Sequence, residues 1–247
     1  MYRSSNPALS NEVFTQAHNT GVGSETMTIN GTVNKTGLLG LIVFGAALFT
    51  WYQFENGNLA MVTPVMIGGA ILGAISGFVL VFNKTWASWL APVYCVFQGL
   101  FLGGISAFME STYPGIVVQA ILLTFTILFS LLLIYRTGVI KVTENFRLMV
   151  GAATMGIALL YLISFIGSFF NFNIPMIHSN GTWGIVFSLV VIAVAALNLV
   201  MDFDFIERGA EAGAPKYMEW YGAFGLMVTL IWLYLEILRL LSKLRSR

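Results

Sequence analysis

Charged residues, cysteine and histidine are all scarce in this chain of 247 residues. Only 9% of the residues are charged, compared with about 25% in soluble domains. The one cysteine cannot form an internal disulfide, and His18 and His178 lie far apart in the sequence. CxxC, HExxH and Walker lysine motifs are absent, so zinc, haem and nucleotide sites have no sequence support. We therefore expect no metal centre and no cofactor.

Basic and acidic residues are also nearly balanced, with 12 Lys and Arg against 11 Asp and Glu. Nucleic-acid binding requires a basic surface that such a balance does not supply. No nucleic-acid partner is therefore expected.

Apolar residues, by contrast, are abundant. They account for 57% of the chain, and the mean hydropathy is +0.83. Seven apolar runs each approach the roughly 20 residues that span a bilayer as a helix: 36–54, 60–82, 86–109, 115–135, 147–170, 183–205 and 217–242. The sequence predicts an all-α polytopic membrane protein, a seven-transmembrane helix bundle in contact with lipid.

The chain divides into two parts by composition. Residues 1–35 are rich in Asn, Ser, Thr and Gly and have few apolar side chains to bury, so we expect a mobile polar cytoplasmic tail. Residues 36–247 form the seven-helix transmembrane domain, because the loops between the runs are too short for a further soluble domain.

The distribution of Lys and Arg predicts the orientation. These residues occur before the first run and in the loops after the second, fourth and sixth runs, whereas the loops after the first, third and fifth runs contain none. By the positive-inside rule the N-terminus is cytoplasmic. Lys243, Arg245 and Arg247 oppose this assignment, so the last helix either crosses against the rule or is re-entrant. Crossing is favoured, since early helices usually dominate orientation.

Asp202 is the main candidate for a functional site. It follows Trp183 to Met201, a stretch without charge, and an ionisable residue within a membrane helix is costly unless it has a function. Asn198 lies four residues earlier on the same helix face, whereas Asp204 points about 200° away and is expected near water. Asp202, Asp204 and Asn198 are therefore candidates for an ion or pH gate.

The alternative interpretation is that Asp202 lies at the membrane interface. In that case it pairs with Arg208 or Lys216. The two interpretations depend on where the helix ends, and sequence patterns place helix ends only to within about a turn.

Three other ionisable residues are secondary candidates. Glu236 and Arg239 are three residues apart on the last helix, a spacing that permits a local ion pair. Such a pair neutralises both charges and lets the helix span, with a gating role as the alternative. Glu110 ends the third run beside Tyr113 and Pro114. It is interpreted as a solvated loop residue, although an acid at an outer mouth attracts cations.

Glycines repeat at four-residue spacing in the second and third runs. Small residues on one face let membrane helices approach closely. We interpret them as packing faces of these two helices, with a substrate passage or a dimer seam as the alternative. The residues are Gly69, Gly73, Gly77, Gly99 and Gly103.

Four segments carry a family resemblance. Ser5-Asn-Pro-Ala-Leu-Ser10, Met27 to Thr36, Gln98 to Ser106 and Glu219 to Leu241 together resemble the bacterial Bax inhibitor-1-like (transmembrane Bax inhibitor motif) membrane proteins. The resemblance implies a seven-helix bundle with the last helix in the centre, in the bacterial inner membrane. It also implies a pH-sensitive latch of carboxylates on helices 6 and 7 that controls a calcium leak in some members, and restraint of a membrane-bound protease by others.

The latch residues transfer only in part. Asp202 lies where the helix 6 aspartate is expected, with Asp204 as the alternative after a two-residue shift. When the segment around Arg239 is aligned with the similar C-terminal segment of those relatives, the position of their helix 7 aspartate corresponds to Thr229. A hydroxyl cannot share a proton or neutralise calcium as a carboxylate does. Gln98 likewise replaces a glutamate that many relatives carry.

Two function hypotheses follow. The first is a passive cation leak, for calcium or another cation, with Asp202 as a titrating gate. The second is a non-transporting interaction protein that modulates a membrane protease or a stress response. An enzyme is not expected, because no nucleophile and base form a pair in the apolar runs.

Overall fold

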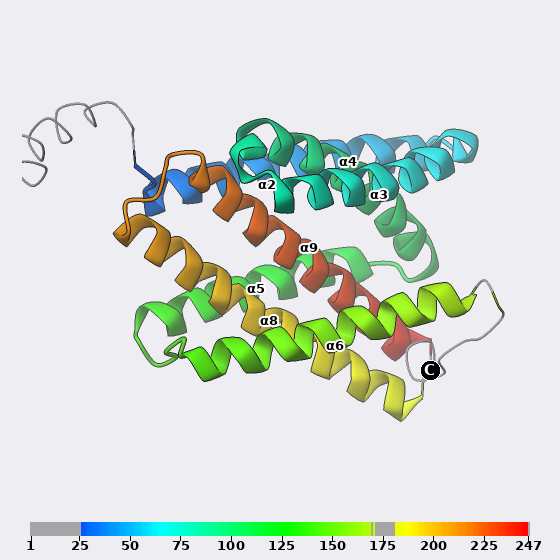
Figure 1. Cartoon of the computed structure of the whole chain (residues 1–247). Coiled ribbons are helices and arrows are strands. Elements are labelled where there is room, and N and C mark those ends of the chain that lie inside the picture. Colours follow the sequence, from blue (N-terminus) through cyan, green and yellow to red (C-terminus); the bar gives the residue numbers. More distant parts are fainter. Residues whose placement is uncertain (1–25, 169, 171–180, 247) are drawn as a thin grey trace, which may run out of the picture.

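The computed structural model describes residues 26–168, 170 and 181–246. These residues form seven long helices and one short 3₁₀ turn (Figure 1). The elements are α2 Ile29–Glu55, α3 Leu59–Phe82, η2 Lys84–Trp86, α4 Ala87–Thr112, α5 Ile116–Arg136, α6 Glu144–Ser168, α8 Thr182–Glu211 and α9 Met218–Arg245.

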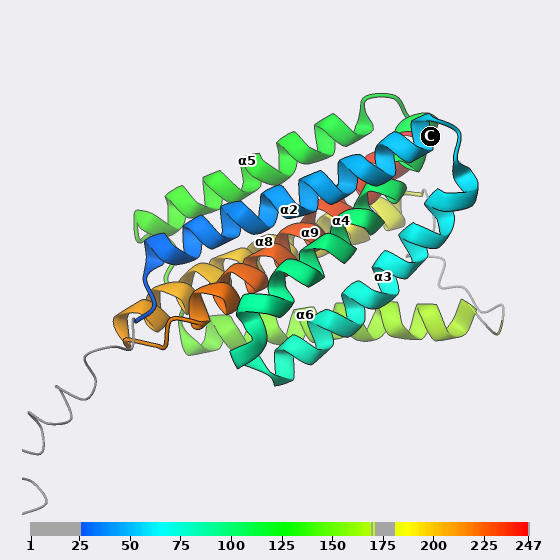
Figure 2. The same cartoon turned by 90° about the horizontal axis from the view of Figure 1, so that it is seen from above.

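All seven long helices are long and apolar enough to cross a membrane. This confirms the predicted all-α, seven-helix membrane fold. Seen from above, α2, α5 and α8 run in similar directions along the bundle (Figure 2). The last helix, α9, contacts α2, α4, α5 and α8, so it is the central helix, as predicted.

The N-terminal end of α2 lies earlier than the sequence indicated. The predicted run began near residue 36, whereas the helix begins at Ile29. Thr28 is its N-cap and accepts a hydrogen bond from the Gly31 N–H at 3.0 Å, which is the usual means of starting a helix. The start near residue 36 was wrong because capping and tertiary contacts order polar residues that hydropathy assigns to the tail. Residues 1–25 of that predicted tail lie outside the described residues.

The repeated glycines lie where helices approach closely. A Cβ on Gly69 would lie 2.6 Å from the Phe97 carbonyl oxygen of α4, and a Cβ on Gly103 would meet the Ala47 backbone of α2. Gly73 and Gly77 also face α4, as Gly69 does, whereas Gly99 faces α2 together with Gly103. The α4 glycines therefore pack against α2, a helix that the sequence interpretation did not include.

The central helix α9 runs the full length of the bundle. Near its start, Glu219 accepts hydrogen bonds from Thr28 at the beginning of α2. Near its end, Lys243 donates to the Gly184 carbonyl at the start of α8, and Arg245 donates to the Pro114 carbonyl between α4 and α5. Its 28 residues extend about 42 Å at 1.5 Å per residue. This geometry agrees with a crossing helix and not with a re-entrant one.

Candidate functional site

Asp202 lies on α8 and faces α9. A Cβ on Gly225 of α9 would be 3.8 Å from its Oδ1 atom, and the Thr229 hydroxyl lies within reach of the carboxyl group. Its Oδ2 atom is shielded from water and has no hydrogen-bond partner among the described residues. The side chains proposed as interfacial partners bind elsewhere: Arg208 pairs with Asp204, and Lys216 pairs with Glu219. The structure therefore does not show the pairing required by the interfacial interpretation.

Asn198 lies one turn before Asp202 on α8. Its Nδ2 atom donates to Thr154 Oγ1 on α6 at 2.7 Å and to the Val194 carbonyl at 2.9 Å. The amide is thus bound to α6, while the carboxyl group of Asp202 is directed towards α9. The two side chains belong to one polar region, but no direct bond between them is seen in the described residues.

Asp204 is buried beneath its partners, whereas the sequence indicated a position near water. Its side chain is only 12% exposed, and it accepts hydrogen bonds from Arg147 of α6 at 2.6 Å and from Arg208 at 3.0 Å. Helical geometry correctly placed it away from Asp202, but that face of α8 is covered. A buried carboxylate with two guanidinium partners is neutralised, so Asp204 holds α6 to α8.

Thr229 is buried on α9 and donates to the Gly225 carbonyl one turn earlier at 3.3 Å. No carboxylate of α9 therefore faces Asp202 at this position. Among the residues that the structure describes, no group of three or more His, Cys, Asp or Glu side chains could hold a metal ion. A cation at Asp202 would have one carboxylate and neutral oxygens as ligands.

A second polar group lies further along α9. Glu236 is almost completely buried and pairs with Arg239 at 3.0 Å. Tyr161 of α6 donates to Glu236 at 2.7 Å and accepts from Arg239 at 2.6 Å. The pair that the spacing suggested is therefore in place, and a hydroxyl group of α6, not foreseen from the sequence, completes it.

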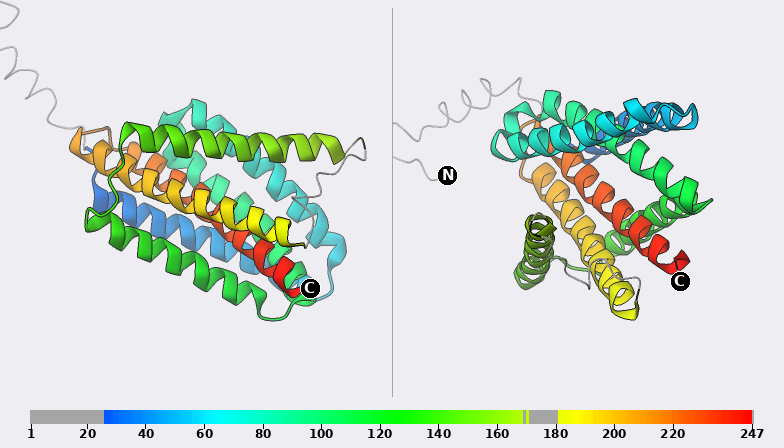
Figure 3. Two further views of the ribbon diagram at one scale, coloured as in Figure 1. Left: turned by 90° about the horizontal axis from the view of Figure 1, so that it is seen from below. Right: turned by 90° about the vertical axis from the view of Figure 1, so that its right-hand side faces the viewer.

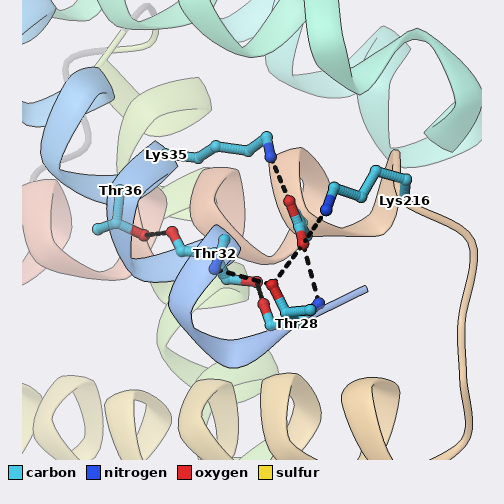
Figure 4. Close-up of polar contacts among 7 residues, drawn as sticks. Thr28, Thr32, Lys35, Thr36 and Lys216 are labelled. Carbon is cyan, nitrogen blue, oxygen red and sulfur yellow. Dashed lines mark hydrogen bonds and ion pairs between the residues drawn. The ribbon is translucent and has the colours of Figure 1, made fainter. Parts of the chain in front are cut away.

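Glu219 is the ionisable residue that sequence reasoning missed. It is fully buried in the first turn of α9, and it binds Lys35 of α2, Lys216 and both the N–H and the hydroxyl of Thr28 (Figure 4). The available signal was a glutamate at the start of an apolar run with two lysines on the same predicted side. These four residues, Thr28, Lys35, Lys216 and Glu219, are called the Glu219 cluster below.

The environment of Glu110 also differs from the one that the sequence indicated. It lies inside α4 and accepts hydrogen bonds from the N–H groups of Gly115 and Val117 at the start of α5. A carboxylate at a helix N-terminus satisfies N–H groups that have no partner within the helix. Glu110 is therefore a capping residue of α5 and not a solvated loop residue. It also lines, with Glu55, a cavity of about 130 Å³ near Trp51.

Residues 6–246 match the family model described as Bax inhibitor 1 like. The chain belongs to the Bax inhibitor 1 like family. Searches of curated proteins and of solved structures found no match. In this Bax inhibitor 1 like chain, the carboxyl group of Asp202 on α8 and the hydroxyl group of Thr229 on α9 lie within reach of each other. At this level α8 and α9 therefore meet through one carboxyl group and one hydroxyl group.

Proposed function

We propose that this member of the Bax inhibitor 1 like family is a passive cation leak in which Asp202 is the gate. One observation carries the proposal: Asp202 Oδ2 lies inside a membrane-length helix, out of contact with water and without a hydrogen-bond partner in the described chain. An unpaired carboxyl group in such a place is unfavourable for folding. Its presence is explained if a cation or a proton binds there during function.

The composition of the site supports transient binding. Calcium prefers six to eight oxygen ligands, whereas Asp202 has only Thr229 and backbone oxygens nearby on α9. Such a set binds a cation weakly, as conduction requires, since an ion must also leave. Calcium and potassium are both candidates, and comparison of the two fluxes tests the choice.

Protonation of Asp202 removes its negative charge, so the leak should respond to pH. The guanidinium groups nearest on α8 and α6, those of Arg208 and Arg147, are held by Asp204. They therefore do not neutralise Asp202 directly. In the acid form the site attracts neither a cation nor a basic side chain, and the contact between α8 and α9 changes.

The direct test is flux of calcium and of potassium into liposomes over a range of pH. Asp202→Asn should show at neutral pH the flux that the wild type shows in acid. Glu211→Gln is the matched control, because Glu211 is an exposed carboxylate on the same helix, and it should follow the wild type. An Asp202→Asn protein with an unchanged pH profile removes the gate from the proposal.

The alternative is a protein that transports nothing and modulates a membrane-bound protease. No flux of either ion from correctly folded protein, together with altered turnover of a protease substrate when the chain is deleted, would favour it. The two outcomes require different assays, so they can be separated.

We also propose a bacterial inner-membrane location with the N-terminus in the cytoplasm. Contacts gather the basic segments at one end of the bundle, where they can share one side of the membrane. Met27 N–H donates to the Ala214 carbonyl, Arg208 donates to the Val142 carbonyl, and Lys84 lies over the Tyr221 ring.

A further inference from the structure

Helix α6 is attached to the bundle along one narrow stripe. The residues of this stripe follow one another at intervals of three and four positions, which places them on one face of the helix. Residues on the other faces, such as Leu148, Met155 and Leu162, are exposed. This stripe comprises Arg147, Val150, Thr154, Ile157, Tyr161 and Ser164, all buried or half-buried.

Three residues of the stripe that are seven positions apart in the chain are polar, and each binds a polar side chain of α8 or α9. The three contacts follow one another along the length of α6. Asp202 lies between the first two of them, because its position on α8 falls between Asp204 and Asn198. We call this set the polar seam: Arg147 with Asp204, Thr154 with Asn198, and Tyr161 with Glu236 and Arg239.

Apolar packing adds little to these contacts. Val150 and Ile157 are the only buried large apolar side chains of α6 among the described residues, whereas α9 is buried on most of its faces. In Figure 3, right, α6 lies to one side of the bundle, beside α8. Within the described residues α6 packs closely against α8 alone, whereas each of the other long helices packs against at least two long helices. Helix α6 is therefore held less firmly than the other helices.

We propose that the polar seam is the route of the cation, and that it opens when α6 separates from α8 and α9. This inference rests on the proposed leak function. When α6 moves away it takes Arg147 with it, which removes one of two positive charges from Asp204 and exposes its Oδ2 atom, while Oδ1 remains bonded to Arg208. The same movement breaks the bond between Thr154 and Asn198, one turn from Asp202. A cation then meets carboxylate, amide and hydroxyl oxygens in sequence, the ligands that hard cations prefer.

Reaction of single cysteines with a small, permanently charged thiol reagent tests the route in liposomes. Thr154→Cys and Met155→Cys are compared in a Cys95→Ala background, since they share one depth in the membrane and differ in helix face. Thr154→Cys should react about tenfold faster or more, because water enters the seam but not the lipid. Equal rates, or faster reaction at residue 155, overturn the route.

A cross-link tests whether separation of α6 is required. Thr154→Cys/Asn198→Cys in the same background is treated with a short bifunctional thiol reagent, and the link is verified by mass spectrometry. Flux should fall about tenfold or more and return after reduction. Each single cysteine with the same reagent is the control. Undiminished flux through fully cross-linked protein overturns the inference.

The two experiments separate this inference from the proposed function. If the wild type shows no flux of any cation, the leak function fails, and the thiol reaction still decides whether the seam opens to water. If the wild type leaks while the seam stays closed to the reagent, the leak stands and the cation takes another route.

Discussion

Replacement of Lys35 by methionine tests how strongly the Glu219 cluster holds α2 against α9. Methionine keeps the length of the side chain and removes its charge. Glu219 has no exposed side-chain surface, and the Lys35 side chain is 19% exposed, whereas that of Lys216 is 42% exposed. The loss of Lys35 therefore leaves a buried carboxylate with one solvent-screened cation and the hydrogen bonds of Thr28.

The magnitude follows from these burial differences. Removal of one partner of a buried ion pair typically costs about 3–5 kcal/mol. Two donors from Thr28 remain on Glu219, so we expect about 3 kcal/mol, at the lower end of that range. Lys216→Met should cost about 1 kcal/mol or less, because exposed pairs contribute little. The ratio of the two effects is the sharper prediction.

Two measurements report on these variants. A loss of about 3 kcal/mol corresponds to a fall in melting temperature of roughly 6–12 °C for a chain of this size, by the scaling found for soluble proteins. Hydrogen exchange of the amides in residues 29–35 should also accelerate, because the Glu219 cluster holds the first turns of α2. The loop between α4 and α5 lies at the other end of α9, where Arg245 binds the Pro114 carbonyl, and it serves as the internal control.

A double-mutant cycle with Glu219→Gln separates the pair from its surroundings. If Lys35 and Glu219 stabilise each other, Lys35→Met/Glu219→Gln should lose less than the sum of the single losses, by about 2 kcal/mol. Equal losses for Lys35→Met and Lys216→Met, or unchanged exchange in residues 29–35, would refute the assignment of the Glu219 cluster as the link between α2 and α9.

Two further predictions concern packing and capping. Gly103→Ala should destabilise the protein by about 1–3 kcal/mol, because the new Cβ meets the Ala47 backbone and overpacking has that cost; Gly45→Ala, which meets nothing within 4 Å, should leave the melting temperature unchanged or slightly higher. Glu110→Gln should cost about 1 kcal/mol through its weaker cap on α5 and should accelerate exchange in residues 115–119. Glu55→Gln is its control, since Glu55 lies in the same cavity but bonds only to Trp51 in the described chain; equal effects of the two would contradict the capping role.

Hydropathy predicted the fold of this chain because membrane spanning demands it. Backbone groups in lipid must be satisfied within the segment, so each apolar run of sufficient length becomes a helix. The predicted runs and the observed helices agree apart from their ends. The largest discrepancy, at Ile29, arises where Thr28 caps α2 and Glu219 binds the cap residue from a distant part of the chain. Hydropathy contains no information about such a contact.

The site was predictable only where its contacts are local in sequence. The spacing of Glu236 and Arg239 indicated their ion pair, and helical geometry separated Asp202 from Asp204. The burial of Asp204 was not predictable, because its partner Arg147 comes from α6, far away in the sequence. Glu219 escaped notice for the same reason, since its partner Lys35 belongs to α2.

The ion pairs of this bundle differ in what they connect. The Glu219 cluster joins α9 to α2, where Leu39 and Thr32 are also buried, so charge and packing act together. Asp204 and Arg147 join α8 to α6. Within the described residues α6 packs closely against α8 alone, whereas α2 packs against α3, α4, α8 and α9. A helix that packs against few neighbours separates more easily, because a closely packed interface resists partial separation. A leak that depends on helix movement should therefore open beside α6, and the unpartnered carboxyl oxygen of Asp202 lies one turn from the contact that α6 would break.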